Sequence, residues 1–436
     1  MNLLDALYLP AAVVTAPWWA RKTRSGWAER FGRTIPRPQP LTGRKRVLLH
    51  AVSVGEVATL RSLVPMLTGA GVDVVVSVGT DTGLKRAKEL YGALPGVSVV
   101  RFALDFSPAV RRFLDAVRPD AVALVELEVW PNFIAECERR GVPVCVINGR
   151  LSARSFKGYH RLIRFFRPVF SRLAFAAAQD PDYADRFALM GVPRERVLIT
   201  GSMKWDATPI AEPGVLAPGA ETLGAELGID RSRPLVVAGS TAPLDRSCEE
   251  ELLSHACPAG GGVQLLCAPR KPEHFDDAFR AMGGSDRCLR RSAIDPSLKG
   301  LKGTDRFLLD TIGELRAAYS LADVVFVGRT FGDQGGSDVI EPVSLRKPVL
   351  IGPRYANFQY VTNLFRQAGA VEVVETTAEL GIRLQSLLND KDRCRDMVDR
   401  GVAVIRAQQG ATAKHCELIL SLAGVGGGQP GPRREV

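Results

Sequence analysis

The sequence predicts an α/β protein made of two doubly wound, Rossmann-like domains, each built on a parallel sheet. Short apolar runs alternate with helical patterns along most of the chain, as expected for parallel strands linked by helices. Five prolines and glycines between residues 206 and 220 interrupt this alternation, which then restarts. A length of 436 residues also exceeds what one hydrophobic core usually supports, so two domains are expected.

The same pattern sets the expected boundaries. An N-terminal membrane-associated segment spans 1–33, a first domain 34–205, a linker 206–220 and a second domain 221–423, whose last helix could pack back on the first. The Gly/Pro-rich tail 424–436 is expected to be disordered. Strands are expected at 46–51, 73–78, 97–102, 120–125, 143–148, 172–178 and 196–200, then at 234–238, 262–268, 322–327 and 348–351. Helices are expected at about 55–69, 272–281, 358–367 and most of 377–422.

The N-terminal segment predicts contact with a membrane. Residues 3–20 are apolar apart from Asp5, contain Trp18 and Trp19, and precede a basic cluster at 21–24. Because the basic residues follow the apolar run, the segment predicts an uncleaved anchor or in-plane helix at the inner (cytoplasmic) membrane, with the body in the cytoplasm. The alternative is a buried amphipathic helix that packs on the body.

The composition narrows the classes of binding partner that we expect. The net charge of +10 favours anionic partners such as nucleotide phosphates, phosphorylated glycolipids or an anionic membrane. No basic run is interleaved with aromatic residues, so nucleic acid is not expected as a partner. The eight cysteines form no C-x-x-C pair and the five histidines are dispersed, so neither a disulfide framework nor a metal site is expected.

The turn after the first strand carries the strongest catalytic candidate. Val47–Leu49 is an apolar run, and Glu56 lies where the next helix should begin. Ligands of open α/β sheets bind beyond the carboxyl ends of the strands, so this carboxylate faces the expected cleft. It suits a general base. The alternative is that Glu56 only complements the helix dipole.

Further charged residues follow later strands of the first domain. Glu126 and Glu128 come directly after an apolar strand and before Trp130. One strand later, Arg150 and Arg154 lie in a polar loop that suits a phosphate or carboxylate, or is a solvated turn. Lys204 ends the first domain, where it suits a leaving phosphate, although a junction lysine is more often solvated.

The second domain carries the features of a phosphate site. Arg270 and Lys271 lie between a strand end and a helix start, an arrangement that suits a phosphate. The turn 311–314 opens another helix, and 324–341 reads as a strand, a Gly-rich loop and a helix start with Glu341 able to bind ribose hydroxyls. The loop matches neither a dinucleotide fingerprint nor a P-loop.

Together and in this order, these segments resemble the Kdo transferase family. Its members are membrane-associated GT-B glycosyltransferases that transfer 3-deoxy-D-manno-octulosonic acid (Kdo) from CMP-Kdo to a lipid A precursor in lipopolysaccharide biosynthesis. The resemblance spans nearly the whole chain, in the segments 26–32, 53–56, 126–132, 148–155, 200–206, 269–273, 322–328 and 335–341.

The resemblance implies a role for each matching residue. Glu56 would be the general base of an inverting displacement, with Glu126 and Lys204 assisting in the transition state. The acceptor would contact Ser53, Gly55, Arg150 and Arg154. No metal or other cofactor is implied beyond the donor substrate CMP-Kdo. The residues implied to hold CMP are Pro269, Arg270, Ile312, Gly313, Glu314, Asp338, Val339, Ile340 and Glu341.

Departures from the family pattern gather on the donor side. The chain has 242–250 where the family has a His and a Gly-Glu-Glu, and Lys271 where a His is usual. Arg329 replaces a glycine, and Ser337 and Asp338 replace a His-Asn pair. These changes leave two alternatives open: a related GT-B enzyme that uses or epimerises another nucleotide sugar, and a non-catalytic membrane-bound protein that binds glycolipid.

Overall fold

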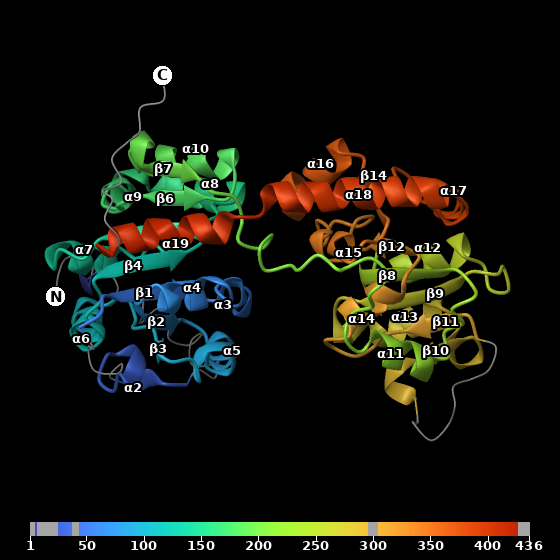
Figure 1. Cartoon of the computed structure of the whole chain (residues 1–436), viewed down its shortest axis with the longest axis horizontal. Helices are drawn as coiled ribbons and strands as arrows, with labels where there is room; N and C mark the ends of the chain where they lie inside the picture. The colour runs from blue at the N-terminus through green and yellow to red at the C-terminus, as the bar shows by residue number, and fades with distance from the viewer. Residues whose placement is uncertain (1–4, 7–24, 37–42, 295–303, 426–436) are drawn as a thin grey trace. The chain divides into compact units, whose positions relative to one another are not determined.

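The chain folds into two α/β units. A computed structural model describes residues 5–6, 25–36, 43–294 and 304–425 (Figure 1). Unit 1 comprises Met1–Ala207 and Gln408–Val436, and unit 2 comprises Thr208–Ala407. The α/β class with two parallel sheets is therefore confirmed. The roles assigned to the domains from the sequence stay predictions.

Unit 1 is built on a seven-stranded parallel sheet with the order β3-β2-β1-β4-β5-β6-β7. β1 is the third strand in this order and lies between β2 and β4, with Leu49 opposite Val76 on one side and Ala123 on the other. Its apolar side chains alternate between two cores, as expected for a strand covered on both faces. The strands are β1 (Arg46–Ala51), β2 (Asp73–Val78), β3 (Val97–Arg101), β4 (Ala121–Val125), β5 (Val144–Gly149), β6 (Ala176–Ala178) and β7 (Val197–Ile199).

Helices cover both faces of this sheet. One core includes residues of α6 (Ser107–Val117), α7 (Pro131–Arg139), α9 (Ile163–Phe170) and α10 (Pro181–Met190). The other includes α3 (Val54–Thr59), α4 (Leu63–Gly69), α5 (Asp81–Tyr91) and the C-terminal α19 (Ala411–Leu422), which packs against α4 and β4 (Figure 1). Unit 1 also contains the helices α2 (Trp27–Arg30), α8 (Ala153–Arg161) and η1 (Arg194–Arg196).

Unit 2 repeats this plan with the order β10-β11-β9-β8-β12-β13-β14. β8, the first strand of unit 2, lies at the centre between β9 and β12, as β1, the first strand of unit 1, lies between β2 and β4. The core on one face contains residues of α12, α13, α17 and α18, and α14 packs on β8. The strands are β8 (Leu235–Thr241), β9 (Gln264–Pro269), β10 (Cys288–Arg290), β11 (Arg306–Leu308), β12 (Val324–Val327), β13 (Val349–Ile351) and β14 (Val371–Val373). The helices are α11 (Ala220–Leu227), α12 (Glu249–Ala256), η2 (Pro272–His274), α13 (Phe275–Ala281), η3 (Gly284–Asp286), η4 (Arg291–Ala293), α14 (Leu315–Leu321), α15 (Ile340–Ser344), η5 (Ala356–Phe358), α16 (Gln359–Gln367), α17 (Thr377–Asn389) and α18 (Lys391–Gln408).

Several expected elements differ in detail. The single helix expected at about 55–69 is two helices, because Pro65 has no N–H to continue the ladder and its ring clashes with the carbonyl of residue 61. The helical region expected over most of 377–422 is confirmed and consists of three helices, with breaks at Asp390 and at Gly410, which has φ 104°. The strand expected at 172–178 is only β6, since 171–175 form a turn after α9.

The N-terminal prediction falls mostly outside the described residues, as does most of the tail. Asp5 is described: it is buried, and its Oδ1 accepts hydrogen bonds from the backbone N–H of Ser107 (2.9 Å) and from Asn132 Nδ2 (3.2 Å). At this position the segment contacts the body of unit 1, which favours the packed alternative there. Among the helices of the described ranges, none is long and apolar enough to cross a bilayer.

Candidate functional site

Glu56 forms a complete capping box at the start of α3. The side chain of Ser53 accepts a hydrogen bond from the backbone N–H of Glu56 (3.2 Å) and donates one to Glu56 Oε1 (2.7 Å). The carboxylate also accepts the backbone N–H groups of Val52 (2.8 Å) and Ser53 (3.2 Å). The capping box therefore supports the alternative that Glu56 serves only the start of α3. The same bonds hold the carboxylate in one orientation at the carboxyl end of β1. Gly55 lies in the same turn, where a Cβ would meet only Ser53 Oγ, at 3.8 Å.

Glu126 lies at the carboxyl end of β4, which neighbours β1 in the sheet. Its φ of 62° is a left-handed conformation that a non-glycine residue rarely adopts, and such strain is typical of functional sites. Burial raises the pKa of Glu126, and the negative charge of Glu56 raises it further, while the charges of Arg150 and Lys204 lower it. The structure thus brings four of the predicted residues together at one edge of the sheet.

Glu128 belongs to the same cluster, although the sequence analysis assigned it no role. Burial and then the charge of Glu56 raise its pKa to about 7, against a hydrogen bond from Trp130 Nε1 (3.0 Å). A carboxyl group that titrates near neutral pH beside other acids is a common feature of catalytic sites. The Glu-x-Glu spacing directly after a strand was the sequence signal for it.

Lys204 is held by the residues on both sides of it. Met203 and Trp205 are buried, and the backbone N–H of Met203 donates to Asn148 Oδ1 at the end of β5 (3.0 Å). Asp206 accepts the backbone N–H groups of Gly410 and Thr412, both 2.6 Å, and so caps α19. The returning C-terminal helix therefore fixes the backbone around Lys204.

The arginines predicted for the acceptor separate. Arg150 is half-buried beside Glu126 and donates to the hydroxyl of Tyr183 (3.4 Å). Arg154 is exposed in the first turn of α8. From 153 to 168 the two helices α8 and α9 contain no acidic residue, and their exposed side chains include Leu162, Phe165 and the basic residues Arg154, Lys157, His160, Arg161, Arg164 and Arg167.

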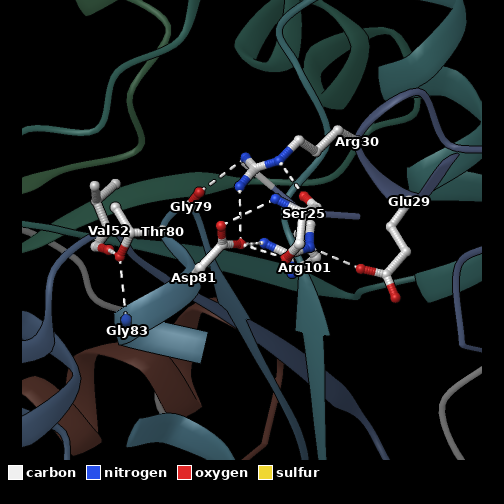
Figure 2. A network of polar contacts seen from close by, with 9 residues as sticks. All are labelled: Ser25, Glu29, Arg30, Val52, Gly79, Thr80, Asp81, Gly83 and Arg101. Carbon is white, nitrogen blue, oxygen red and sulfur yellow. Dashed lines mark hydrogen bonds and ion pairs between the residues drawn. The ribbon is translucent and has the colours of Figure 1, made fainter. Parts of the chain in front are cut away.

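A partly buried ionic network joins the Glu56 turn to the segment 25–32 (Figure 2). Thr80 Oγ1 donates to the carbonyl of Val52 (2.6 Å), and Asp81 next to it bonds Ser25, Arg30 and Arg101. Burial would raise the pKa of Asp81, but the bonds from Ser25 and Arg101 lower it to about 2. The segment with which the family resemblance begins is thus part of the framework around the candidate base.

In unit 2 the predicted donor residues follow adjacent strands. Pro269 is buried at the end of β9, and Arg270 after it is exposed. Ile312 and Gly313 after β11 are exposed, whereas Glu314 is half-buried and accepts hydrogen bonds from Arg291 Nη2 (3.1 Å) and from Thr311. The order β11-β9-β8-β12 brings these segments and 338–341 to one edge of the sheet.

The segment 338–341 offers backbone as well as side chains. Val339 and Ile340 are buried, so only their main-chain groups can reach a ligand. Asp338 Oδ1 accepts a hydrogen bond from the N–H of Ile340 (2.9 Å), and Glu341 Oε1 lies 3.7 Å from Arg316 Nη1. The buried Ser337 Oγ has no hydrogen-bond partner among the described residues, as expected of a group that awaits a polar ligand.

A pocket of about 430 Å³ adjoins this loop. Gly335 lines it together with residues that follow β13. Asn357 donates to the carbonyl of Gln334 (3.0 Å) and so ties the two sides of the pocket together. The lining residues are Asp333, Gly335, Pro353, Arg354, Tyr355, Ala356 and Gln359.

Asp180 and Asp182, one of two D-x-D pairs in the sequence (the other is Asp390 and Asp392), follow β6 at the start of α10. Asp180 caps α10 by accepting the N–H of Tyr183 (2.7 Å), a structural role typical of an aspartate before a helix. Across the described residues, no group of three or more His, Cys, Asp or Glu is arranged to hold a metal ion.

Comparisons with known proteins agree on one family. The sequence profile of the 3-deoxy-D-manno-octulosonic-acid transferase (kdotransferase) family matches residues 25–207. The 3-deoxy-D-manno-octulosonic acid transferase of Bordetella pertussis is 31% identical over 423 residues, 92% of this chain and 94% of that protein. The Haemophilus influenzae transferase of the same name is 29% identical and covers 91% of each chain. A solved structure of a UDP-N-acetylglucosamine 2-epimerase (putative) from Listeria monocytogenes has a TM-score of 0.59 at 13% identity, with 90% of this chain and 100% of that chain covered, and shows the shared fold.

Proposed function

The chain belongs to the 3-deoxy-D-manno-octulosonic acid (Kdo) transferase family and is a glycosyltransferase of lipopolysaccharide biosynthesis, and we propose that it transfers Kdo from CMP-Kdo to a lipid A precursor with inversion. The observation that carries this proposal is the cluster of Glu56, Glu126, Lys204 and Arg150 at one edge of the unit 1 sheet. Paired carboxylates with a fixed lysine suit a reaction that moves a proton and releases a phosphate.

Glu56 takes the proton from the acceptor hydroxyl as the hydroxyl oxygen attacks the anomeric carbon of Kdo. Its hydrogen bonds to Val52 and Ser53 fix the carboxylate for this transfer. General-base assistance contributes about 10²–10⁴-fold to the rate. The Glu56 carboxylate acts from the capping box, so one residue serves both the helix and the reaction.

The developing charge on CMP is met by cations. Lys204 acts in unit 1, and in unit 2 Arg270 with the backbone of 338–341 holds the nucleotide. Electrostatic stabilisation of this kind is usually the largest contribution to catalysis. The mechanism assigns no step to a metal ion, and metal independence stays a prediction.

The acceptor and the membrane meet at α8 and α9. The six exposed basic side chains between 154 and 167, without an acidic residue among them, suit a phosphorylated glycolipid in an anionic membrane. Leu162 is 60% exposed and Phe165 40% exposed, and both suit the acyl boundary. The protein would act at the cytoplasmic face of the inner membrane.

The test is transfer of radiolabelled Kdo from enzymatically generated CMP-Kdo to a lipid A precursor. We expect product with the wild-type protein, and protection against thermal unfolding by CMP but not by UDP. No transfer by a folded protein that UDP protects would replace this proposal with another nucleotide sugar. CMP protection without any turnover would indicate a non-catalytic glycolipid-binding protein.

A further inference from the structure

Glu249, the first residue of α12, is fully buried and accepts four backbone hydrogen bonds. Its Oε2 accepts the N–H groups of Ala242 (3.1 Å) and Arg329 (2.7 Å). Its Oε1 accepts those of Thr330 (2.9 Å) and Phe331 (3.1 Å). One carboxylate therefore joins the loop after β8 to the loop after β12, two neighbouring strands.

The backbone at the start of the second loop fits around this carboxylate. Three consecutive N–H groups point at Glu249, and Arg329 adopts φ 63° to allow it. A Cβ on Gly328 would lie 2.6 Å from Glu249 Oε2 and 2.7 Å from Thr241 Cα, so only glycine fits there. The positive φ of Arg329 explains why glycine would also suit position 329.

The same contacts continue into the Gly-rich part of the loop. Arg329 Nη2 donates to the carbonyl of Gln334 (3.0 Å), and the N–H of Gly336 donates to the carbonyl of Arg329 (2.8 Å). Gln334 Nε2 donates to the carbonyl of Pro243 (2.8 Å), in a short turn between Ala242 and Glu249. Two departures from the family pattern, 242–250 and Arg329, are thus parts of one network.

We propose that Glu249 is a positioning residue for the donor: its carboxylate sets the shape of the loop 328–336, and this loop leads the chain into 338–341. The inference rests on the proposed function in one respect, that 338–341 contact the nucleotide. An ionised carboxylate offers only acceptors, so all four N–H groups are satisfied by one side chain. No other residue type of this size offers both oxygens.

Glu249→Gln tests this with little change in volume. The amide keeps one oxygen for two N–H groups and turns an NH₂ donor toward the other two, which leaves them unsatisfied. We expect the dissociation constant for CMP and the KM for the donor to rise about tenfold or more, with the KM for the acceptor unchanged. The KM difference is diagnostic, because a general loss of packing would affect both substrates.

Glu250→Gln is the matched control. Glu250 is the next residue, is also buried, and bonds the side chain of Thr241 rather than the loop 328–336. We expect it to change the donor constants by less than about threefold. Equal effects of the two substitutions on both substrates would overturn the inference, as would wild-type CMP binding by folded Glu249→Gln.

Gln334→Ala keeps the inference testable if Glu249→Gln fails to fold. It leaves Glu249 in place and removes only the bond to Pro243. A smaller rise in the donor constants alone is expected, and unchanged donor constants would contradict the network. If the wild-type protein binds UDP instead of CMP, the donor in the proposed function is wrong, and the same variants measured with UDP decide the role of Glu249.

Discussion

The first strand of each unit leads to a glutamate at the start of a helix, and the two glutamates have different environments. After β1, Glu56 is half-buried, and within the part of the chain that the structure describes its carboxylate accepts hydrogen bonds from its own turn, at Val52 and Ser53. After β8, Glu249 is fully buried and accepts N–H groups from its own turn and from the loop after β12. The first keeps a carboxylate accessible for chemistry, while the second uses its carboxylate to shape backbone.

The next strand shows the same contrast. β4 in unit 1 and β12 in unit 2 hold equivalent places in their sheets, and each is followed by a residue at positive φ. In unit 1 this residue is Glu126, whose side chain joins the charged cluster. In unit 2 it is Arg329, whose N–H group binds Glu249. One architecture therefore presents reactive side chains in unit 1 and ordered main chain in unit 2.

Replacing a lysine in each unit should give the largest difference. Lys204→Met keeps the apolar stem and removes the charge, so we expect kcat to fall by about 10²–10³-fold. Lys391→Met is the control, because Lys391 is exposed at the start of α18 in unit 2, away from every residue given a role in binding or catalysis. It should change kcat by less than about twofold. Comparable losses from both would remove the contrast between the units.

Glu128→Gln should show how much the carboxylate cluster lowers the free energy of unfolding. The folded-state pKa of Glu128 is raised to about 7, so the folded protein binds more protons than the unfolded chain between about pH 4.5 and 7. Stability from this group is therefore lost as the pH rises through that range. Glu128→Gln should raise the free energy of unfolding by about 1–3 kcal/mol at pH 8 and by little at pH 5. Denaturant titrations at both pH values measure this, and an equal effect at both would show that Glu128 is not the titrating group.

Arg329→Gly should give the smallest effect. Glycine relieves a left-handed residue, which favours folding by about 1 kcal/mol, but it removes the bond from Arg329 to Gln334. We expect a net change in stability within about 1 kcal/mol, and retained CMP binding, since the N–H group to Glu249 stays. Loss of CMP binding would mean that the guanidinium, rather than the backbone, serves the donor.

The sequence analysis predicted the long buried strands and the short strands β6, β7 and β13, and it missed β10, β11 and β14. Runs such as Val74–Val76 and Ala121–Val125 are continuous apolar stretches, as strands covered on both faces are. Each of β10, β11 and β14 has three residues, too few to show an alternation of apolar and polar side chains. β11 also begins with Arg306, a buried arginine whose guanidinium donates hydrogen bonds to backbone carbonyls. Their existence depends on pairing with neighbours that are distant in sequence.

The residues of the candidate site could also be predicted only in part. Residues next to strand ends, such as Glu56 and Glu126, can be found because the carboxyl ends of parallel strands share an edge. The role of Glu249 could not, since its partners Thr330 and Phe331 lie about eighty residues away in the chain. Glu128 was noticed only as one of a pair, because burial rather than sequence raises its pKa.

The central claim is that Glu56 acts as the base and does not only cap α3. Glutamine also completes a capping box, so Glu56→Gln keeps the helix start and removes the base. The decisive measurement is kcat for Kdo transfer by Glu56→Gln beside Glu56→Ala, with CMP binding as the control for unit 2. We expect kcat to fall by about 10²–10⁴-fold in both, CMP binding to be retained in both, and only Glu56→Ala to lose about 0.5–2 kcal/mol of stability. Wild-type kcat in Glu56→Gln would contradict the account and leave Glu56 as a cap.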